Sequence, residues 1–208
     1  MSEVDNVVVS ARLTKASEKQ QADNKTLFGF WVYLMTDCVL FASLFATFAV
    51  LHSNNFGGPT AHDLFSLPYA LTETLILLVS SFTCGLAILS AQNKSKHLVL
   101  FWLGITFLLG ASFLGLEIHE FANFVHMGDS WRRSGFLSSY FTLVATHGLH
   151  ITVGLLWILT MIFRISKGGF TRMTVRQLTI MSLFWHFLDL IWIFIFSVVY
   201  LISGGLNI

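Results

Sequence analysis

Charge is scarce in this sequence. Acidic and basic residues together make up 11% of its 208 residues, and the formal net charge is +1. Average soluble domains carry about a quarter charged residues, so this chain cannot cover a surface that faces water. It has no basic run for nucleic acid, and its only two cysteines, Cys38 and Cys84, lie in apolar stretches and imply no disulfide framework. A soluble globule, a disordered tail and a nucleic-acid binder are therefore excluded, which leaves an integral membrane protein.

Apolar residues, in contrast, are abundant: they make up 55% of the chain and include 21 phenylalanines. A hydrocarbon core of about 30 Å needs about 20 apolar residues in a helix. Five segments meet this length: 27–51, 71–91, 98–121, 136–163 and 179–203. Aromatic residues toward the ends of these spans are predicted interfacial anchors, namely Trp31, Trp102, Trp131 and Tyr200. The sequence thus predicts an all-α integral membrane protein, with a bundle of five transmembrane helices within residues 27–208.

The basic residues predict the orientation of the chain in the membrane. Residues 1–26 mix acids and bases, lack the core of a signal peptide and are predicted to form a mobile cytoplasmic tail. Only Arg132 and Arg133 fall on the opposite side of the membrane. Ten basic residues share the side of the tail: Arg12, Lys15, Lys19, Lys25, Lys94, Lys96, Arg164, Lys167, Arg172 and Arg176. Because cytoplasmic loops carry the excess of Lys and Arg, the N-terminus is predicted to be cytoplasmic and the C-terminus periplasmic.

Acidic residues, unlike basic ones, occur inside the predicted spans. Five of the eleven acids do so: Asp37, Glu73, Glu117, Glu120 and Asp189. An intramembrane acid costs a few kcal/mol on insertion scales and has to be protonated, hydrogen-bonded or paired with histidine. Glu73, Glu117 and Glu120 lie near the outer ends of their spans, so we expect them to be outer-interface acids that water reaches. This position favours polar helix ends over a paired-carboxylate active site.

Two acids lie deeper, and histidines accompany one of them. Asp37 and Asp189 are each about 15 Å into the membrane from the cytoplasmic side at 1.5 Å per residue. His186 precedes Asp189 by three residues and shares its helical face, and His147 and His150 have the same spacing in the fourth span. These five residues are the predicted members of a buried polar network.

Several chemistries compete for this network. Asp–His hydrogen bonds can hold helices together where hydrophobicity cannot, and deep acids also serve as proton relays. A metal site would have only two ligands on one turn, His147 and His150, unless His186 joined them. A b-type haem could use His147 or His150 together with His186. The residue chemistry favours the helix-holding interpretation.

Three stretches together resemble a known family. They are Thr146-His147-Gly148-Leu149-His150, the stretch Trp185 to Trp192 (WHFLDLIW) and the stretch Trp31 to Phe41 around Asp37. All three are similar to motifs of subunit III of the haem-copper respiratory oxidases. The sequence around residues 28–31 and 57–60 is most similar to the quinol-oxidising branch, cytochrome o ubiquinol oxidase.

The resemblance carries expectations for single residues. Larger relatives have seven helices in this subunit, and the five spans here correspond to the last five. The buried acid of those relatives is usually glutamate, whereas this chain has the shorter Asp37, which disfavours a direct bond to His147 of the family kind, although a water could bridge the two. Arg164 aligns with a family arginine that holds a phospholipid phosphate, which implies structural phospholipid.

The resemblance implies a non-catalytic accessory subunit III of a proton-pumping quinol oxidase in the bacterial cytoplasmic (inner) membrane. Such a chain binds no haem or copper of its own; these belong to the partner catalytic subunit I, which oxidises quinol and reduces dioxygen to water. The accessory subunit would support assembly, lipid binding and proton uptake. Two alternatives remain open on the residues alone: a stand-alone proton or ion transporter that uses Asp37 and Asp189, and a small b-type cytochrome.

Overall fold

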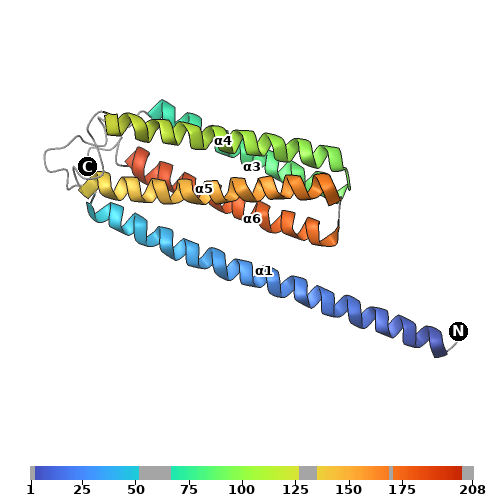
Figure 1. Ribbon diagram of the computed structural model, residues 1–208. Coiled ribbons are helices and arrows are strands. Elements are labelled where there is room, and N and C mark those ends of the chain that lie inside the picture. The colour runs from blue at the N-terminus through green and yellow to red at the C-terminus, as the bar shows by residue number, and fades with distance from the viewer. Residues whose placement is uncertain (1–2, 52–66, 127–134, 169–170, 203–208) are drawn as a thin grey trace. The chain divides into compact units, whose positions relative to one another are not determined.

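The computed structural model describes residues 3–51, 67–126, 135–168 and 171–202, and within them the chain is helical (Figure 1). The helices are long. Their bounds are α1 Glu3–Leu51, α3 Leu67–Gln92, α4 Lys96–His126, α5 Gly135–Gly168 and α6 Arg172–Ile195, followed by a π-helical turn, η1, Phe196–Ile202. No strand occurs in these residues.

The expectation of five membrane-spanning helices is confirmed for the described residues. Five helical segments are long and apolar enough to cross a membrane: Gln20–Leu51, Pro68–Gln92, Lys96–His126, Gly135–Gly168 and Met173–Tyr200. The helices extend beyond the apolar runs by a few residues at most ends. A helix that leaves the hydrocarbon core continues until a turn residue stops it, so the apolar run sets a minimum length for the helix.

The N-terminal segment differs from the expected tail. Residues 3–26 continue α1 instead of ending at a boundary near residue 27. These residues include no proline and no glycine and contain alanine, lysine, glutamate and glutamine, all good helix formers. The chain divides into two compact units, Met1–Cys38 and Val39–Ile208, whose boundary falls within α1.

In the unit Val39–Ile208, four helices pack as a ring in which each contacts two neighbours. Helix α3 packs on α4, α4 on α5, α5 on α6, and α6 closes on α3. Figure 1 shows these helices lying side by side along a common direction. The turn from α3 to α4 is only three residues long, and its Lys94 has a φ of 56°, the left-handed conformation that ends many helices. Such a short turn forces the two helices to be antiparallel neighbours.

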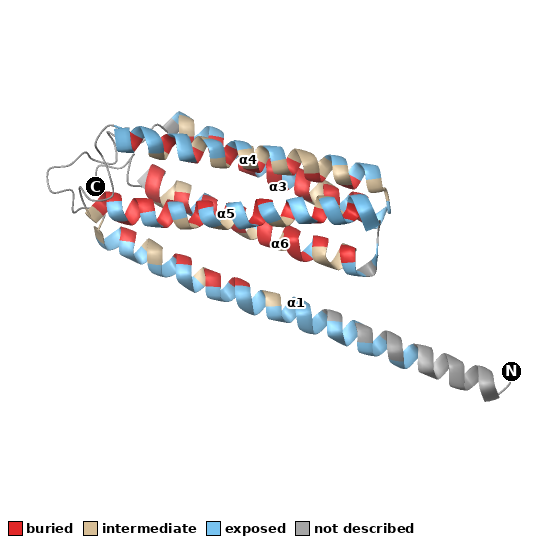
Figure 2. Cartoon of the chain, in the orientation of Figure 1, coloured by how far each residue is buried: buried red, intermediate tan, exposed pale blue. Residues whose placement is uncertain are grey.

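Burial follows the facing sides of these helices (Figure 2). The largest side chains in the core are aromatic, and they include Trp185, Trp192, Tyr140 and Tyr200. Many leucines, valines and phenylalanines are instead exposed on the outer faces. An outer surface this apolar is what a hydrocarbon solvent accepts, because lipid tails do not penalise exposed hydrophobic groups.

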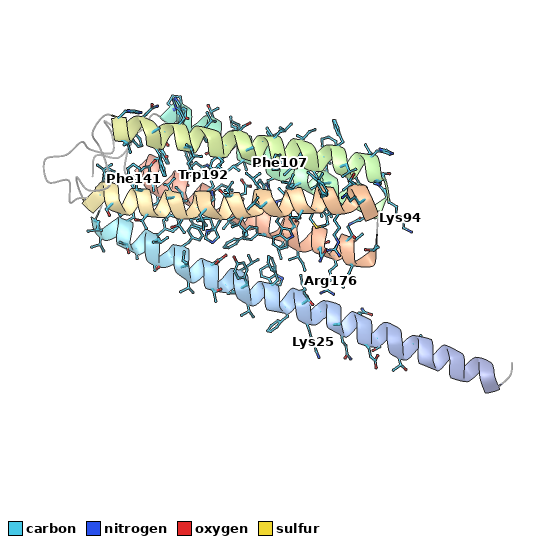
Figure 3. The ribbon with its side chains drawn as sticks, in the orientation of Figure 1. Lys25, Lys94, Phe107, Phe141, Arg176 and Trp192 are labelled. Carbon is cyan, nitrogen blue, oxygen red and sulfur yellow. The ribbon has the colours of Figure 1, made fainter. Side chains whose placement is uncertain are left out.

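Basic residues gather at one end of the four-helix ring. Lys94 and Arg176 lie at this end in Figure 3, whereas Phe141 lies toward the other. The Lys96 Nζ donates a hydrogen bond to the Ser166 carbonyl oxygen at 2.7 Å and ties α4 to α5 there. The shared end agrees with the charge asymmetry of the sequence. Which side of the membrane it faces remains the prediction made from the positive-inside rule.

Candidate functional site

Three glutamates and two tyrosines meet inside the ring and form what we call the carboxyl–tyrosine cluster: Glu73, Glu117, Glu120, Tyr140 and Tyr200. All five are buried, with exposed fractions of 0% for Glu73, 3% for Glu117 and 8% for Glu120. The sequence predicted that water reaches these three acids, whereas the structure buries their side chains. Their position near the ends of the apolar runs predicted contact with solvent. The helices continue past the cluster, however, and neighbouring helices cover the carboxyl groups.

The tyrosines supply hydrogen bonds to one glutamate only. Tyr200 Oη donates to Glu120 Oε2 at 3.2 Å, Tyr140 Oη approaches the same oxygen at 3.4 Å, and the two hydroxyls are 3.0 Å apart. Each hydroxyl carries one hydrogen, so two hydrogens serve three short contacts. Tyr200 is therefore a core residue that fixes Glu120, and its expected role as an interfacial anchor is wrong.

The other two carboxyl groups are differently placed. Both carboxyl oxygens of Glu73 and of Glu117 are buried without a hydrogen-bond partner among the described residues. Glu117 presses against α5 at Gly148, where a Cβ atom would lie 3.1 Å from its Oε2. The three carboxyls lie within electrostatic range of one another. An arrangement of this kind disfavours three simultaneous negative charges, because nearby carboxylates repel strongly at low dielectric.

A second polar group joins α3 to α6 halfway along the helices. The Ser81 hydroxyl lies 2.5 Å from His186 Nδ1, and Asp189 lies within electrostatic range of His186. Ser81 and Asp189 are buried, whereas His186 is exposed on the outer surface of the ring. The serine that contacts His186 was not among the residues predicted from the sequence.

The predicted histidine pair of the fourth span has different partners. His147 is fully buried and stacks on Trp192 with ring centroids 5.4 Å apart, and Phe113 meets it edge-on at 6.1 Å. His150 Nδ1 donates to the Thr146 carbonyl oxygen at 2.7 Å. Phe41 packs against both imidazoles. His147 and His150 therefore belong to the aromatic core of α5, which is separate from the Ser81–His186–Asp189 group.

Asp37 is the remaining member of the predicted network. It lies in the first unit, next to Thr36, whose hydroxyl donates to the Tyr33 carbonyl oxygen at 2.6 Å. The four other members lie in the second unit. The pairing of Asp37 with His147 stays a prediction. Arg132, Arg133, Trp131 and the glycine-rich connection at residues 57–60 lie outside the described residues.

Two tryptophans of the WHFLDLIW stretch tie α6 to α3. Trp192 Nε1 donates to Thr74 Oγ1 and Trp185 Nε1 donates to Ser80 Oγ, each at 3.1 Å. The Trp185 ring also fills a slot between Gly110 of α4 and Gly154 of α5. Sequence reasoning missed these partners. The polar serines and threonines of the second span were the available signal, since a buried indole N–H nearly always has an acceptor.

Arg164 lies near the C-terminal end of α5, at the basic end of the ring. Its Nη1 donates to Gln177 Oε1 at 2.7 Å, and Lys167 Nζ lies 4.8 Å from the centroid of the Phe163 ring. An apolar groove of about 740 Å³ runs beside Arg164, lined by Leu159, Thr160, Phe163, Arg164, Lys167 and Gly168. Two cationic side chains, Arg164 and Lys167, therefore line this apolar groove.

Among residues 3–51, 67–126, 135–168 and 171–202, no group of three or more His, Cys, Asp or Glu side chains is arranged to hold a metal ion. Five apolar helices, buried carboxyl groups between them and basic residues at one end define an all-helical multi-pass membrane protein. The family model described as "Cytochrome c oxidase subunit III" matches residues 6–204. The chain belongs to this family.

The relatives include both branches of the family. A Pseudomonas aeruginosa protein named "Cytochrome bo(3) ubiquinol oxidase subunit 3" is 56% identical over 179 residues, 86% of each chain. A Bacillus spizizenii protein named "Quinol oxidase subunit 3" is 46% identical over 86% of this chain and 89% of its own. A "Cytochrome c oxidase subunit 3" from Bacillus sp. (strain PS3) is 47% identical over 88% of each chain.

Proposed function

We propose that this chain is the non-catalytic subunit III of a bo-type ubiquinol oxidase in a bacterial cytoplasmic membrane. The observation that carries the proposal is the 56% identity to a ubiquinol oxidase subunit 3 over 86% of both chains. Haem and copper would belong to the partner catalytic subunit I. This chain would pack beside that subunit, stabilise the assembled complex and support proton uptake by it.

Lipid binding is the part of the proposal that the geometry addresses most directly. One guanidinium N–H group of Arg164 is bound to Gln177. A guanidinium has five N–H donors, so others remain for a phosphate, and such charge-assisted bonds are about twice as strong as neutral ones. The neighbouring apolar groove would take an acyl chain of the same phospholipid.

Purification of the tagged chain in a mild detergent tests the main proposal. We expect a haem-bearing subunit to co-purify with it and the preparation to oxidise ubiquinol with consumption of dioxygen. Oxidation of reduced cytochrome c in place of quinol would assign the chain to the other branch. Recovery of the chain without a haem protein would contradict the proposal, and proton flux through vesicles that hold only this chain would favour the stand-alone transporter.

Arg164→Ala tests the lipid site in the purified complex. We expect less anionic phospholipid to be retained, as measured by native mass spectrometry. Gln177→Ala is the matched control, because it breaks the same hydrogen bond to Arg164 and leaves the guanidinium in place. Equal lipid retention in Arg164→Ala and the wild type would remove Arg164 from the proposal.

A further inference from the structure

An exposed histidine lies near the middle of the membrane on the outer surface of the ring. His186 belongs to the span Met173–Tyr200 and Ser81 to the span Pro68–Gln92, each close to the midpoint of its span. At 1.5 Å per residue, His186 is about 20 Å from either end of the span Met173–Tyr200. A histidine side chain is too short to reach an interface over that distance, so His186 cannot place its polar atoms among lipid headgroups.

The ring of His186 is held in place. Its Nδ1 is bonded to Ser81, whose side chain is buried. The second ring nitrogen, Nε2, has no hydrogen-bond partner among the described residues and belongs to an exposed side chain. Because Nδ1 faces the buried serine, Nε2 lies on the opposite side of the imidazole, away from the ring interior.

Several exposed hydroxyls in the spans, in contrast, are satisfied within their own helices. Each hydroxyl of this kind donates to the carbonyl oxygen three or four residues earlier, as in Ser43, Thr47, Thr72, Ser112, Thr142, Thr160, Thr179 and Ser197. A hydroxyl bonded in this way is compatible with hydrocarbon. His186 Nε2 has no such arrangement, and lipid tails offer it neither a donor nor an acceptor. Ionisable residues inside membranes rarely face lipid for this reason.

The surface around His186 also permits the backbone of another helix to approach closely. Gly85 follows Ser81 by one turn on α3, and a Cβ atom there would meet no heavy atom within 4 Å. Exposed apolar side chains flank the two residues: Leu78, Phe82 and Leu190. Small residues at one-turn spacing allow two helix backbones to approach closely in membranes, and polar side chains then form bonds between the helices. We call the surface of Leu78, Phe82, Gly85, His186 and Leu190 the α3–α6 face.

We propose that the α3–α6 face docks a transmembrane helix of the haem-bearing partner subunit, and that this helix places a polar side chain against His186 Nε2 at the bilayer midplane. The inference rests on the proposed function, which supplies a membrane-embedded partner. A protein helix is the occupant because it alone offers a hydrogen-bonding group at this depth. The partner backbone crosses over Gly85, and Leu78, Phe82 and Leu190 pack around the contact.

A photo-reactive amino acid at Leu190 tests the docking directly. We expect it to cross-link this chain to the haem-bearing subunit in the assembled complex. The matched control is the same probe at Leu108, which is exposed at mid-helix on α4. Cross-links from position 190 to lipid alone, or to a second copy of this chain, would overturn the inference, and so would cross-linking to the haem subunit from position 108 only.

Two substitutions measure the strength of the contact. His186→Leu should lower the affinity for the haem-bearing subunit by about 3- to 20-fold, the range that interhelical hydrogen bonds span in membranes. Gly85→Leu should block the close approach, while Gly104→Leu, at an equally open glycine of α4, should leave binding unchanged. Unchanged co-purification of both His186→Leu and Gly85→Leu would contradict the inference.

The outcomes separate the two proposals. If the wild-type chain recovers no haem protein, the proposed function fails before the face is tested. If the wild-type chain recovers the haem-bearing subunit and the probe at position 190 does not cross-link to that subunit, the proposed function stands and the proposed docking at the α3–α6 face is refuted. Ser112→Ala serves as a further control, because it removes an exposed hydroxyl that is already satisfied within α4.

Discussion

Replacement of Gly110 by alanine tests how Trp185 holds three helices together. A Cβ atom at Gly110 would lie 2.7 Å from Trp185 Cη2, 2.8 Å from Cζ2 and 3.0 Å from a Leu155 methyl carbon. Carbon atoms attract best at about 3.5–4.0 Å, so the indole would have to retreat by about 1 Å. Retreat is obstructed, because Gly154 lies against the same ring and the indole N–H is bonded to Ser80.

The magnitude follows from three contributions. Overpacking a core of this kind costs about 1–3 kcal/mol. Loss of the bond from Trp185 to Ser80 adds about 0.5–1.5 kcal/mol. Alanine is the better helix former by about 1 kcal/mol, which offsets part of the cost. The expected destabilisation is therefore about 2 kcal/mol, and it should lower the melting temperature by about 4–8 °C at this chain length.

Thermal melting of the purified complex in detergent measures the effect. Gly115→Ala is the matched control on the same helix, since its Cβ would meet no heavy atom within 4 Å. We expect that variant to melt at the wild-type temperature or slightly above it. A Gly110→Ala complex that melts no lower than the Gly115→Ala complex would refute the argument.

A double variant adds a second test of the same contact. Phenylalanine at position 185 lacks the outer indole atoms that the new methyl group would meet. Combining Gly110→Ala with Trp185→Phe should therefore destabilise the protein by less than the sum of the two single changes. Strict additivity would show that the methyl group acts on something other than the Trp185 ring.

Three further changes should each lower the melting temperature in the same assay. Tyr200→Phe removes the shorter hydrogen bond to Glu120 and should cost about 1 kcal/mol, because Glu120 Oε2 then keeps only the longer contact from Tyr140. Trp192→Phe removes the bond to Thr74 and should cost about 1 kcal/mol. Thr171→Ala removes the N-cap of α6 and should cost about 1 kcal/mol, whereas Thr171→Ser should keep wild-type stability. Wild-type melting of any of the three destabilising variants would contradict the role given to that hydroxyl or indole.

The helices themselves were predictable from local sequence. Runs of about 20 apolar residues have one stable form in hydrocarbon, because every backbone N–H and C=O must be bonded within the segment. The described helices correspond to the five predicted runs. The charged N-terminal segment was harder to predict, since a polar stretch with good helix formers gives no apolar signal where a helix crosses into water.

The site was predictable only in part. His186 and Asp189 share a helical face and were grouped from their spacing, but Ser81, the partner of His186, lies on α3 and is distant in sequence. His147 and His150 have the same spacing, yet they pack with aromatic rings instead. Spacing along one helix shows which side chains share a face. It does not show which neighbouring helix that face meets.

The sequence by itself determined a membrane protein of five helices with basic residues at the segment ends, because hydrophobic length and charge position act on each segment separately. Tertiary structure decided what the scarce polar residues do. The rotation and packing of α3, α4, α5 and α6 bury Glu73, Glu117 and Glu120 against two tyrosines and leave His186 exposed at mid-membrane. Helix rotation depends on contacts between segments far apart in the chain, such as Trp185 in its glycine slot. No local pattern encodes those contacts.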